Sequence, residues 1–281
     1  MTELSGTDRS VHEEAIEPTD QELTGSCFIV GAPIEEREDI TQRGIRALQS
    51  ADLVVTGDEK HAASLMKRYA ISKKLLGIGP GIERDVLGVV MERLREGKRV
   101  VLLSAPSFMI FPALGRLIAE IRNAGLEPRV LPGVDLASTT IVMSGFPANR
   151  YYVAGRLPAR SILIEDFADR VSTIDVTVVI DGGGARLRSS LEIFGRILGD
   201  RPAAVILRPT VPGEVIRRGP ASSLPEHFRD ASFRGDWILV VGPTVYADEI
   251  EDAGTATTYL PESAGGSEVD GQSTTQTESE D

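Results

Sequence analysis

Polar residues that could move a proton stand where short apolar runs end. Asp58 and Lys60 follow the run "DLVV", and Asp181 follows "TVVI". Carboxylates and amines in such places can act as general acids or bases during group transfer. These three residues are the candidate catalytic groups, although an ordinary charged helix start also explains Asp58 and Lys60.

Other local motifs are weak or missing. The segment "DGGGARLRSSLE" (181–192) joins a strand end, a glycine loop and a helix start, where a phosphate can bind. It lacks G-x-G-x-x-G and G-K-[ST] spacing, so a turn or a close backbone approach to another ligand is the alternative. The three histidines (His12, His61 and His227) are scattered and have no cysteine partners, so we predict no metal site.

The elements that must position these residues alternate between strand and helix up to about residue 147. The predicted strands lie in "SCFIV", "DLVV", "RVVLLS" and "EPRVLPG", and the predicted helices fill the segments between and after them. Asp39 or Thr41 is a suitable N-cap for the first helix, and Gly97 and Gly125 end two later ones. Strands continuous in Val, Leu and Ile predict a parallel sheet with helices on both faces.

The spacing of the predicted elements changes in the second half of the chain. A strand in "TIDVTVVI" and an amphipathic helix in "RLRSSLEIFGRILG" precede the closely spaced strands "RPAAVILRPT", "GEVIRRG" and "GDWILVVGP". Close spacing is typical of a mixed, partly antiparallel sheet. The predicted fold is therefore two-domain α/β: an N-terminal domain at 25–147 and a C-terminal one at 148–244.

The formal charge of −12 is concentrated at the two ends. Residues 1–24 carry −6 and residues 245–281 carry −10, which leaves +4 for the middle of the chain. Acidic segments poor in large apolar residues are typical of disorder. We interpret them as solubilising tails; competition with an anionic partner for a basic surface is the alternative.

Neither membrane insertion nor export is expected. No apolar run approaches the roughly 20 residues of a membrane span, and the acidic N-terminus lacks the apolar stretch of a signal peptide. The single cysteine, Cys27, cannot form an internal disulfide. A cytoplasmic protein is the expectation.

Ligands of such folds bind at the carboxyl ends of strands. The relevant loops are 31–33, 56–58, 104–108, 131–135 and 181–184. The loop after the third predicted strand is unusual, because it carries Phe108, Met109, Ile110 and Phe111 between two prolines.

Several ordered segments resemble the ribosomal RNA small-subunit methyltransferase I family of the tetrapyrrole methylase superfamily. The segments are "FIVGAPIEEREDITQRGIRALQSADLVV", "LREGKRVVLLS", "AGLEPRVLPG", "MSGFPANRYYVAGRLPAR" and "RGDWILVVG". In the first of them the residues in register with the family motif are Pro33, Ile34, Asp39, Ile40, Thr41, Arg43, Leu48, Ala51, Asp52 and Leu53. The resemblance spans roughly residues 26–242.

The resemblance implies a two-domain methyltransferase, usually a homodimer, that binds S-adenosylmethionine between its domains. The activity it implies is ribose 2′-O-methylation of a cytidine in small-subunit ribosomal RNA, and relatives methylate tetrapyrroles or diphthine precursors. The cofactor-binding residues that it implies are Gly31, Ala32, Pro33, Ser104, Ala105, Pro106, Pro132, Gly133, Val134 and Ser138.

The ligand loops depart from the family pattern. The loop that reads S-D-A-G-T-P in the family is Ser104-Ala-Pro-Ser-Phe-Met109 here, and F-Y-E-S is Ile180-Asp-Gly-Gly183. Two hypotheses stay open: an active S-adenosylmethionine-dependent methyltransferase, whose substrate is ribosomal RNA, a tetrapyrrole or another small molecule, and an inactive relative that serves as a binding or regulatory module.

Overall fold

The structure of the protein is a computed structural model. It describes residues 25–79, 83–104, 112–147, 149–158, 160–229, 233 and 235–244. The predicted tails at 1–24 and 245–281 lie outside the described residues.

The first sheet is fully parallel, as predicted. Its strands are β1 (Ser26–Val30), β2 (Leu53–Thr56), β3 (Lys74–Gly77), β4 (Arg99–Leu103) and β5 (Arg129–Leu131). They lie in the order β3-β2-β4-β1-β5, and every neighbouring pair is parallel. Strand β3 was not predicted, because "KLLG" is short, only partly buried and lacks a strong apolar run.

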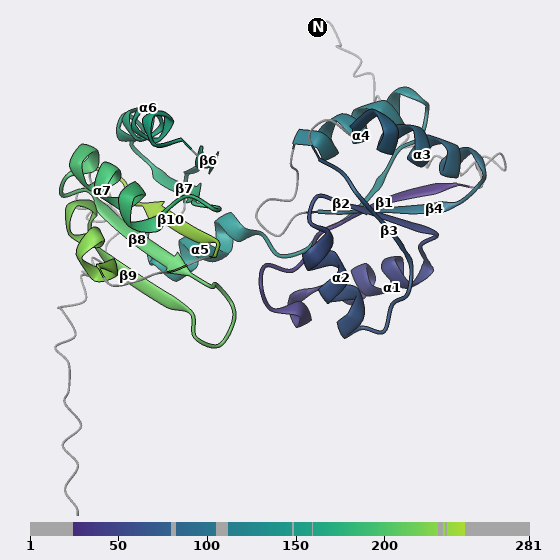
Figure 1. Cartoon of the computed structure of the whole chain (residues 1–281), viewed down its shortest axis with the longest axis horizontal. Coiled ribbons are helices and arrows are strands. Elements are labelled where there is room, and N and C mark those ends of the chain that lie inside the picture. Colours follow the sequence, from purple (N-terminus) through teal and green to yellow (C-terminus); the bar gives the residue numbers. More distant parts are fainter. Residues whose placement is uncertain are drawn as a thin grey trace, which may run out of the picture. The chain divides into compact units, whose positions relative to one another are not determined.

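Helices cover both faces of this sheet, which confirms the prediction (Figure 1). One face packs on α3 (Glu83–Arg95) and α4 (Pro112–Asn123), and the other on α1 (Gln42–Ser50) and α2 (Glu59–Arg68). Thr41 is the N-cap of α1, with its side chain accepting from the Gly44 amide at 3.1 Å. Positive φ angles at Gly97 and Gly125 follow the ends of α3 and α4.

The second sheet is mixed, again as predicted. It consists of β6 (Tyr151–Arg156), β7 (Thr177–Asp181), β8 (Pro202–Leu207), β9 (Val215–Pro220) and β10 (Trp237–Val241). The order is β6-β7-β10-β8-β9; only the β6–β7 pair is parallel. The sequence analysis named no strand at β6, whose residues are mostly exposed.

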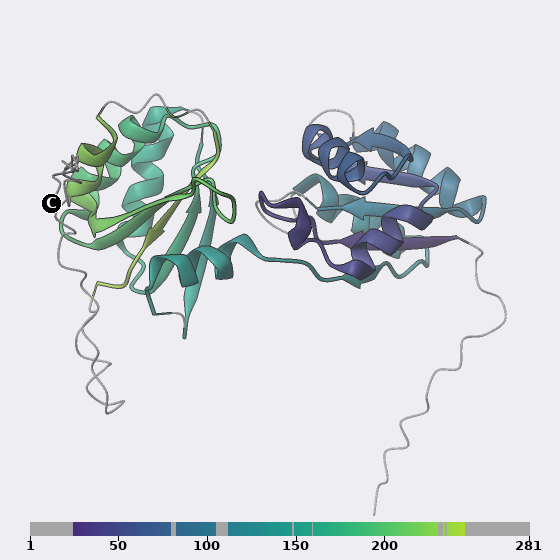
Figure 2. The same ribbon diagram turned by 90° about the horizontal axis from the view of Figure 1, so that it is seen from below.

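Helices also lie on both faces of the second sheet. One face packs on α6 (Ser161–Ser172), α7 (Leu187–Leu198) and the 3-10 helix η2 (Ala221–Phe228). The opposite face packs on α5 (Leu136–Ser144), as Figure 2 shows. Although α5 precedes residue 147 in the chain, its Ile141 belongs to the core of the second sheet with Val179 and Ile206. Among the described residues, no helix has the length and apolarity to cross a bilayer.

Candidate functional site

The strand order of the first sheet creates a switch point between β1 and β4. These strands are neighbours, yet the chain leaves them in opposite directions: β1 leads through α1 to β2, and β4 leads through α4 to β5. The two connecting helices lie on opposite faces of the sheet. In open α/β sheets, ligands bind beside such a point, outside the carboxyl ends of the strands.

Three of the predicted cofactor loops meet at this edge. The Ala32 amide donates to Ser104 Oγ at 2.9 Å, and the Ser104 amide donates to the Val30 carbonyl at 2.9 Å, so the loops after β1 and β4 are joined. The Gly31 amide donates to the Leu131 carbonyl at 3.1 Å, which joins the loop after β5. Sequence-distant residues are thereby held in one place by short polar contacts.

Gly31 and Gly133 bring their backbones into direct contact. A Cβ on Gly31 would lie 2.5 Å from the Gly133 nitrogen, and a Cβ on Gly133 would lie 2.7 Å from the Gly31 oxygen. No side chain fits at either position without moving the backbone. The contact leaves peptide groups, rather than side chains, at the centre of this edge.

The other predicted cofactor residues are placed differently. Pro33 is buried, whereas Pro132 and Val134 are exposed beside Gly133. Ser138 lies in the first turn of α5, where its amide donates to the Asp135 N-cap at 2.8 Å. The predicted residues Ala105 and Pro106, like the four large apolar residues at 108–111, lie outside the described residues.

Asp58 and Lys60 lie at the start of α2, directly after β2, which is the neighbour of β4 in the sheet. Asp58 is the N-cap of the helix: its Oδ1 accepts from the His61 amide at 2.9 Å, and its own amide donates to Thr56 Oγ1 at 3.2 Å. Asp58 and Lys60 are both exposed. The cap therefore explains Asp58 structurally and still leaves its second carboxylate oxygen at the surface.

The loop after β1 is fastened to α2 along its length. It continues into the 3-10 helix η1 (Arg37–Asp39), where Arg37 Nε donates to Ser64 Oγ at 3.3 Å. Tyr69 donates its hydroxyl to the Arg37 carbonyl at 3.1 Å, and Arg68 forms an ion pair with Glu38. The conformation of this ligand loop thus depends on side chains of α2.

His61, in the first turn of α2, follows Asp58, Glu59 and Lys60 in a polar cluster that the sequence explains either as a charged helix start or as part of an active-site rim. Its Nε2 is buried and, within the described part of the chain, has no hydrogen-bond partner. Burial lowers the pKa of His61 most, and the positive charge of Arg37 lowers it further; Asp58 and the Pro33 carbonyl act in the opposite direction. The only available sequence signal was its position directly after Asp58, Glu59 and Lys60.

The third catalytic candidate, Asp181, ends β7 of the second sheet and is fully buried. Its Oδ2 accepts from Arg156 Nε at 2.8 Å and its Oδ1 accepts from the Gly183 amide at 2.8 Å. Both oxygens of the carboxylate are engaged. In this geometry Asp181 holds the glycine loop and the end of β6 together.

The same loop packs on the single tryptophan. A Cβ on Gly182 would lie 2.1 Å from the Trp237 ring, and the Gly182 amide donates to the Trp237 carbonyl at 2.7 Å. Trp237 Nε1 donates to the Ala185 carbonyl at 3.0 Å. These contacts favour the turn interpretation of "DGGG", because Gly182 makes room for the ring.

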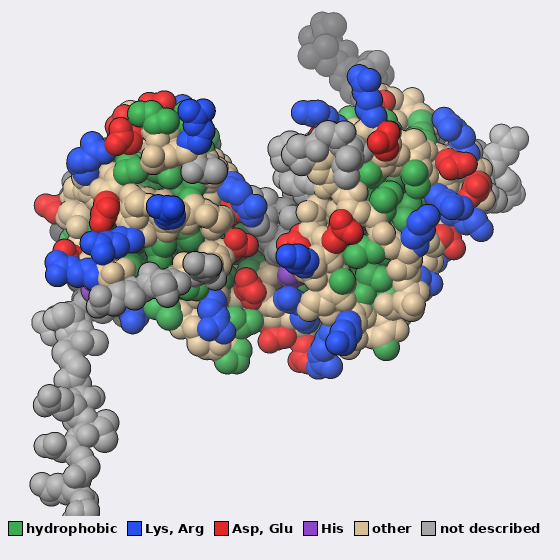
Figure 3. Space-filling model, viewed as in Figure 1, with side chains coloured by type: hydrophobic (Ala, Val, Ile, Leu, Met, Phe, Trp, Pro, Cys, Tyr) green, Lys and Arg blue, Asp and Glu red, His purple; other side chains and the backbone are tan. Residues whose placement is uncertain are grey.

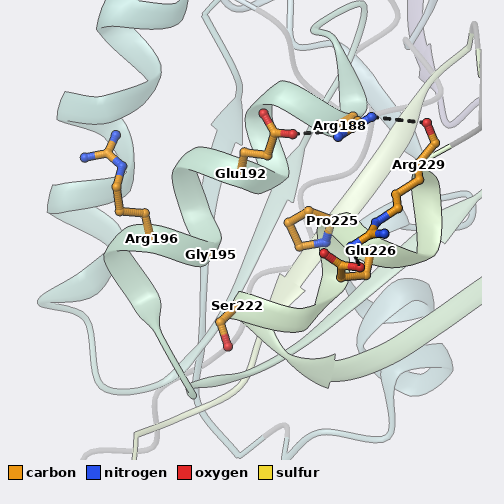
Figure 4. Close-up of a pocket in the computed structure, with 8 residues that line it drawn as sticks. All are labelled: Arg188, Glu192, Gly195, Arg196, Ser222, Pro225, Glu226 and Arg229. Atoms are coloured by element: carbon orange, nitrogen blue, oxygen red, sulfur yellow. Dashed lines mark hydrogen bonds and ion pairs between the residues drawn. The ribbon is translucent and has the colours of Figure 1, made fainter.

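A depression of about 360 Å³ lies between α7 and η2, away from the switch point (Figure 4). It is lined by Arg188, Glu192, Gly195, Arg196, Ser222, Pro225, Glu226 and Arg229. Its charges are already paired: Arg188 with Glu192 at 2.9 Å, and Arg229 with Glu226. Acidic and basic side chains are likewise interspersed over the face in Figure 3. We assign no ligand to this depression.

No metal centre is present among the residues that the structure describes, since none of them form a group of three or more His, Cys, Asp or Glu side chains able to hold an ion.

Sequence comparison relates most of the chain to known methylases. The profile described as Tetrapyrrole (Corrin/Porphyrin) Methylases matches residues 26–225. The ribosomal RNA small subunit methyltransferase I of Haemophilus influenzae is 28% identical over 224 residues, which cover 78% of this chain and 79% of that relative. The protein of the same name from Thermotoga maritima is 27% identical, over 77% of this chain and 98% of that one.

Solved structures share the fold at lower identity. A cobalt precorrin-4 methyltransferase of cobalamin biosynthesis has a TM-score of 0.59 and 20% identity, covering 78% of this chain and 95% of that one. A diphthine synthase has a TM-score of 0.59 and 17% identity, covering 81% and 93%. This likeness supports the architecture of two α/β sheets.

Proposed function

The chain belongs to the tetrapyrrole (corrin/porphyrin) methylase family, and from that premise we propose that it is an S-adenosylmethionine-dependent methyltransferase acting on a ribose hydroxyl of small-subunit ribosomal RNA. The curated relatives named ribosomal RNA small subunit methyltransferase I are 27–28% identical over about four fifths of the chain.

One observation carries the cofactor assignment. The loops after β1, β4 and β5 converge at the switch point, and their convergence is maintained by Ser104 and by the contact of Gly31 with Gly133. Ligands of open α/β sheets bind beside this point. A binding site built from peptide groups also tolerates the loss of family side chains in these loops, because backbone donors and acceptors persist when side chains change.

The residues at this edge fit a purine nucleoside with a cationic sulfur. Pro132 and Val134 offer exposed apolar surface for a flat base, and the peptide groups around Gly31 and Gly133 offer hydrogen bonds. Asp58, at the neighbouring strand end, adds a negative charge. When bound, S-adenosylmethionine supplies an activated methyl group.

The protein's own contribution to such a reaction is mainly positioning. Methyl transfer needs a nucleophile held in line with the methyl group, which is worth several kcal/mol of barrier when the geometry is fixed. A base that accepts the proton of a ribose hydroxyl assists this step. Asp58 keeps one carboxylate oxygen outside its capping bond and suits that role better than Asp181, whose two oxygens are both engaged.

An RNA substrate agrees with the basic groups of the second half of the chain. Residues 148–244 contain thirteen arginines, no lysine and eleven acidic residues, which leaves a small positive charge. Arginine is the residue of choice for binding phosphate groups, because its planar fork can donate two hydrogen bonds at once. We therefore include ribosomal RNA as the partner and the cytoplasm as the place of action in the proposal.

Calorimetric titration of the full chain with S-adenosylmethionine tests the cofactor assignment. We expect binding in the wild type and its loss in Gly133→Arg, whose side chain would enter the contact with Gly31. Gly88→Arg is the matched control, since Gly88 is exposed on α3 and has no atom within 4 Å of an added Cβ. Absence of binding to the wild type at millimolar ligand overturns the proposal in favour of an inactive relative.

Transfer of a labelled methyl group tests the substrate. We expect incorporation into small-subunit ribosomal RNA, with an affinity for RNA that falls as salt is added, because phosphate contacts release counterions. If the label instead enters a tetrapyrrole, with an affinity that does not depend on salt, the assignment of RNA as substrate is overturned. The assignment of methyltransferase activity then still holds.

We also propose a homodimer as the working form, on the strength of the family resemblance. Sedimentation velocity of the full chain tests it: a single species at twice the chain mass of 30.2 kDa is expected. A monomer at micromolar concentration contradicts it.

A further inference from the structure

His61 occupies a position that the proposed function does not use. It extends from the first turn of α2, which borders the ligand loop after β1, and its buried Nε2 has no hydrogen-bond partner among the residues that the structure describes. An unpaired buried polar atom costs roughly 1–3 kcal/mol of stability.

The surroundings of the imidazole favour its neutral form. Burial of the ring lowers its pKa most, and the positive charge of Arg37 lowers it further, whereas the carbonyl of Pro33, in the ligand loop, raises it. The charged groups that act on it are Arg37 of η1 and Asp58 of its own helix. A protonated ring would carry an N–H donor at the buried Nε2, for which the described residues provide no acceptor, within the field of the positively charged Arg37.

Arg37 is itself part of the fastening of the loop. Its Nε donates to Ser64 of α2, its guanidinium also donates to the Glu35 carbonyl, and its own carbonyl accepts from Tyr69. Repulsion between two cations at this point therefore acts on the contacts that seat the loop on α2. The loop leads back directly to Gly31 and Ala32 at the switch point.

We infer that His61 is a positioning residue that holds the loop after β1 in its ligand-binding conformation while its imidazole is neutral and releases the loop when it is protonated. The inference rests on the proposed function in so far as this loop binds S-adenosylmethionine. Since the pKa of His61 is lowered from 6.5 in the folded protein, the seated loop is fully favoured above pH 6.5 and loses that advantage as the pH falls below it.

Calorimetric titration of the full chain with S-adenosylmethionine at pH 7.5, 6.5 and 5.5 tests the inference. We expect the wild-type affinity to fall by roughly fivefold or more across this range, the size of a modest coupling between a loop and a ligand site. His61→Gln, which stays neutral, removes the pH dependence. His61→Ala weakens binding at every pH, and the Gln variant rescues it at pH 7.5.

Two variants separate His61 from other titrating groups. His227→Gln changes an exposed histidine on η2 and is expected to keep the wild-type pH dependence. Glu35→Gln removes a carboxyl of the same loop whose pKa burial raises, and it too is expected to keep the dependence. The inference is overturned if His61→Gln retains the pH dependence or if Glu35→Gln abolishes it.

A readout without ligand keeps this test separate from that of the proposed function. In nuclear magnetic resonance spectra of the labelled chain, the amides of Glu36 and Glu38 are expected to shift with the midpoint of the His61 ring, below pH 6.5. If the wild type binds no S-adenosylmethionine, the proposed function fails while this titration still decides the role of His61. The inference is overturned if the chemical shifts of these loop amides do not change with the midpoint of the His61 titration.

Discussion

Gly31 and Gly133, a hundred residues apart in the chain, touch through their backbones at the carboxyl edge of the first sheet. An added Cβ on the first would lie 2.5 Å from the nitrogen of the second. Such a contact locks the loops after β1 and β5 together and determines which peptide groups face a ligand. Its removal is therefore the most direct perturbation of the candidate site.

We expect Gly31→Ala to destabilise the protein by about 1–3 kcal/mol, because an added methyl group must displace backbone rather than a flexible side chain. The measurement is the free energy of unfolding in urea. Gly88→Ala is the control: it lies in α3 with open space around it, and alanine in a helix is expected to stabilise by about 0.5–1 kcal/mol. Equal effects of the two variants would contradict the proposed contact.

Gly182→Ala probes the packing of the glycine loop on Trp237. Its methyl group would collide with the indole, for which we expect a loss of about 1–3 kcal/mol and a red shift of the fluorescence of the single tryptophan. Gly184→Ala, where an added Cβ meets no atom within 4 Å, is expected to leave the emission unchanged. An unshifted spectrum in Gly182→Ala would show that the ring does not fill this space.

Asp181→Ala tests the buried carboxylate. It leaves the Gly183 amide without its acceptor, and we expect a cost of about 1–3 kcal/mol in urea unfolding. The ion pair between Asp181 and Arg156 contributes little to the free energy of unfolding, because the Arg156 side chain is 55% exposed. Glu192→Ala, which breaks the exposed pair with Arg188, is expected to stay within about 0.5 kcal/mol of the wild type. If Asp181→Ala has the same free energy of unfolding as the wild type, Asp181 does not have this structural role.

Cys27 gives a prediction about pH. Burial raises the pKa of its thiol from 9.0 to about 12, so the native protein is expected not to react with a thiol reagent at pH 8, while the unfolded chain exposes one reactive thiol. Between pH 9 and 12 only the unfolded state ionises, which favours unfolding. We expect the wild type to lose about 1.4 kcal/mol relative to Cys27→Ala between pH 8 and 10. Rapid reaction of Cys27 with the thiol reagent in the native protein at pH 8 would contradict the prediction.

Much of the local structure could be predicted from residue order because its causes are local. Thr41 caps α1 through an amide three residues away, and Gly97 and Gly125 adopt the positive φ that ends a helix. Apolar runs such as "RVVLL" are buried on both faces, as a parallel sheet requires. The strands β3 and β6 were missed, because their exposed residues weaken the apolar signal.

The candidate site was predicted in part. The loops at 31–33, 104–108 and 131–135 were expected at one edge, and the structure brings Gly31, Ala32, Ser104 and Gly133 together there, whereas 105–108 lie outside the described residues. The burial of His61 could not be predicted, because it depends on how the loop after β1 folds back on α2. The roles of Asp58, Lys60 and Asp181 in catalysis stay predictions.

The sequence by itself determined the alternation of strands and helices, the helix caps, and the resemblance to a methylase family, since each is encoded by neighbouring residues or ordered motifs. Tertiary structure decided the rest. It placed β4 between β2 and β1, which creates the switch point, and packed α5 on the second sheet. Strand order and helix docking depend on pairings between residues far apart in the chain, for which spacing within a segment carries no information.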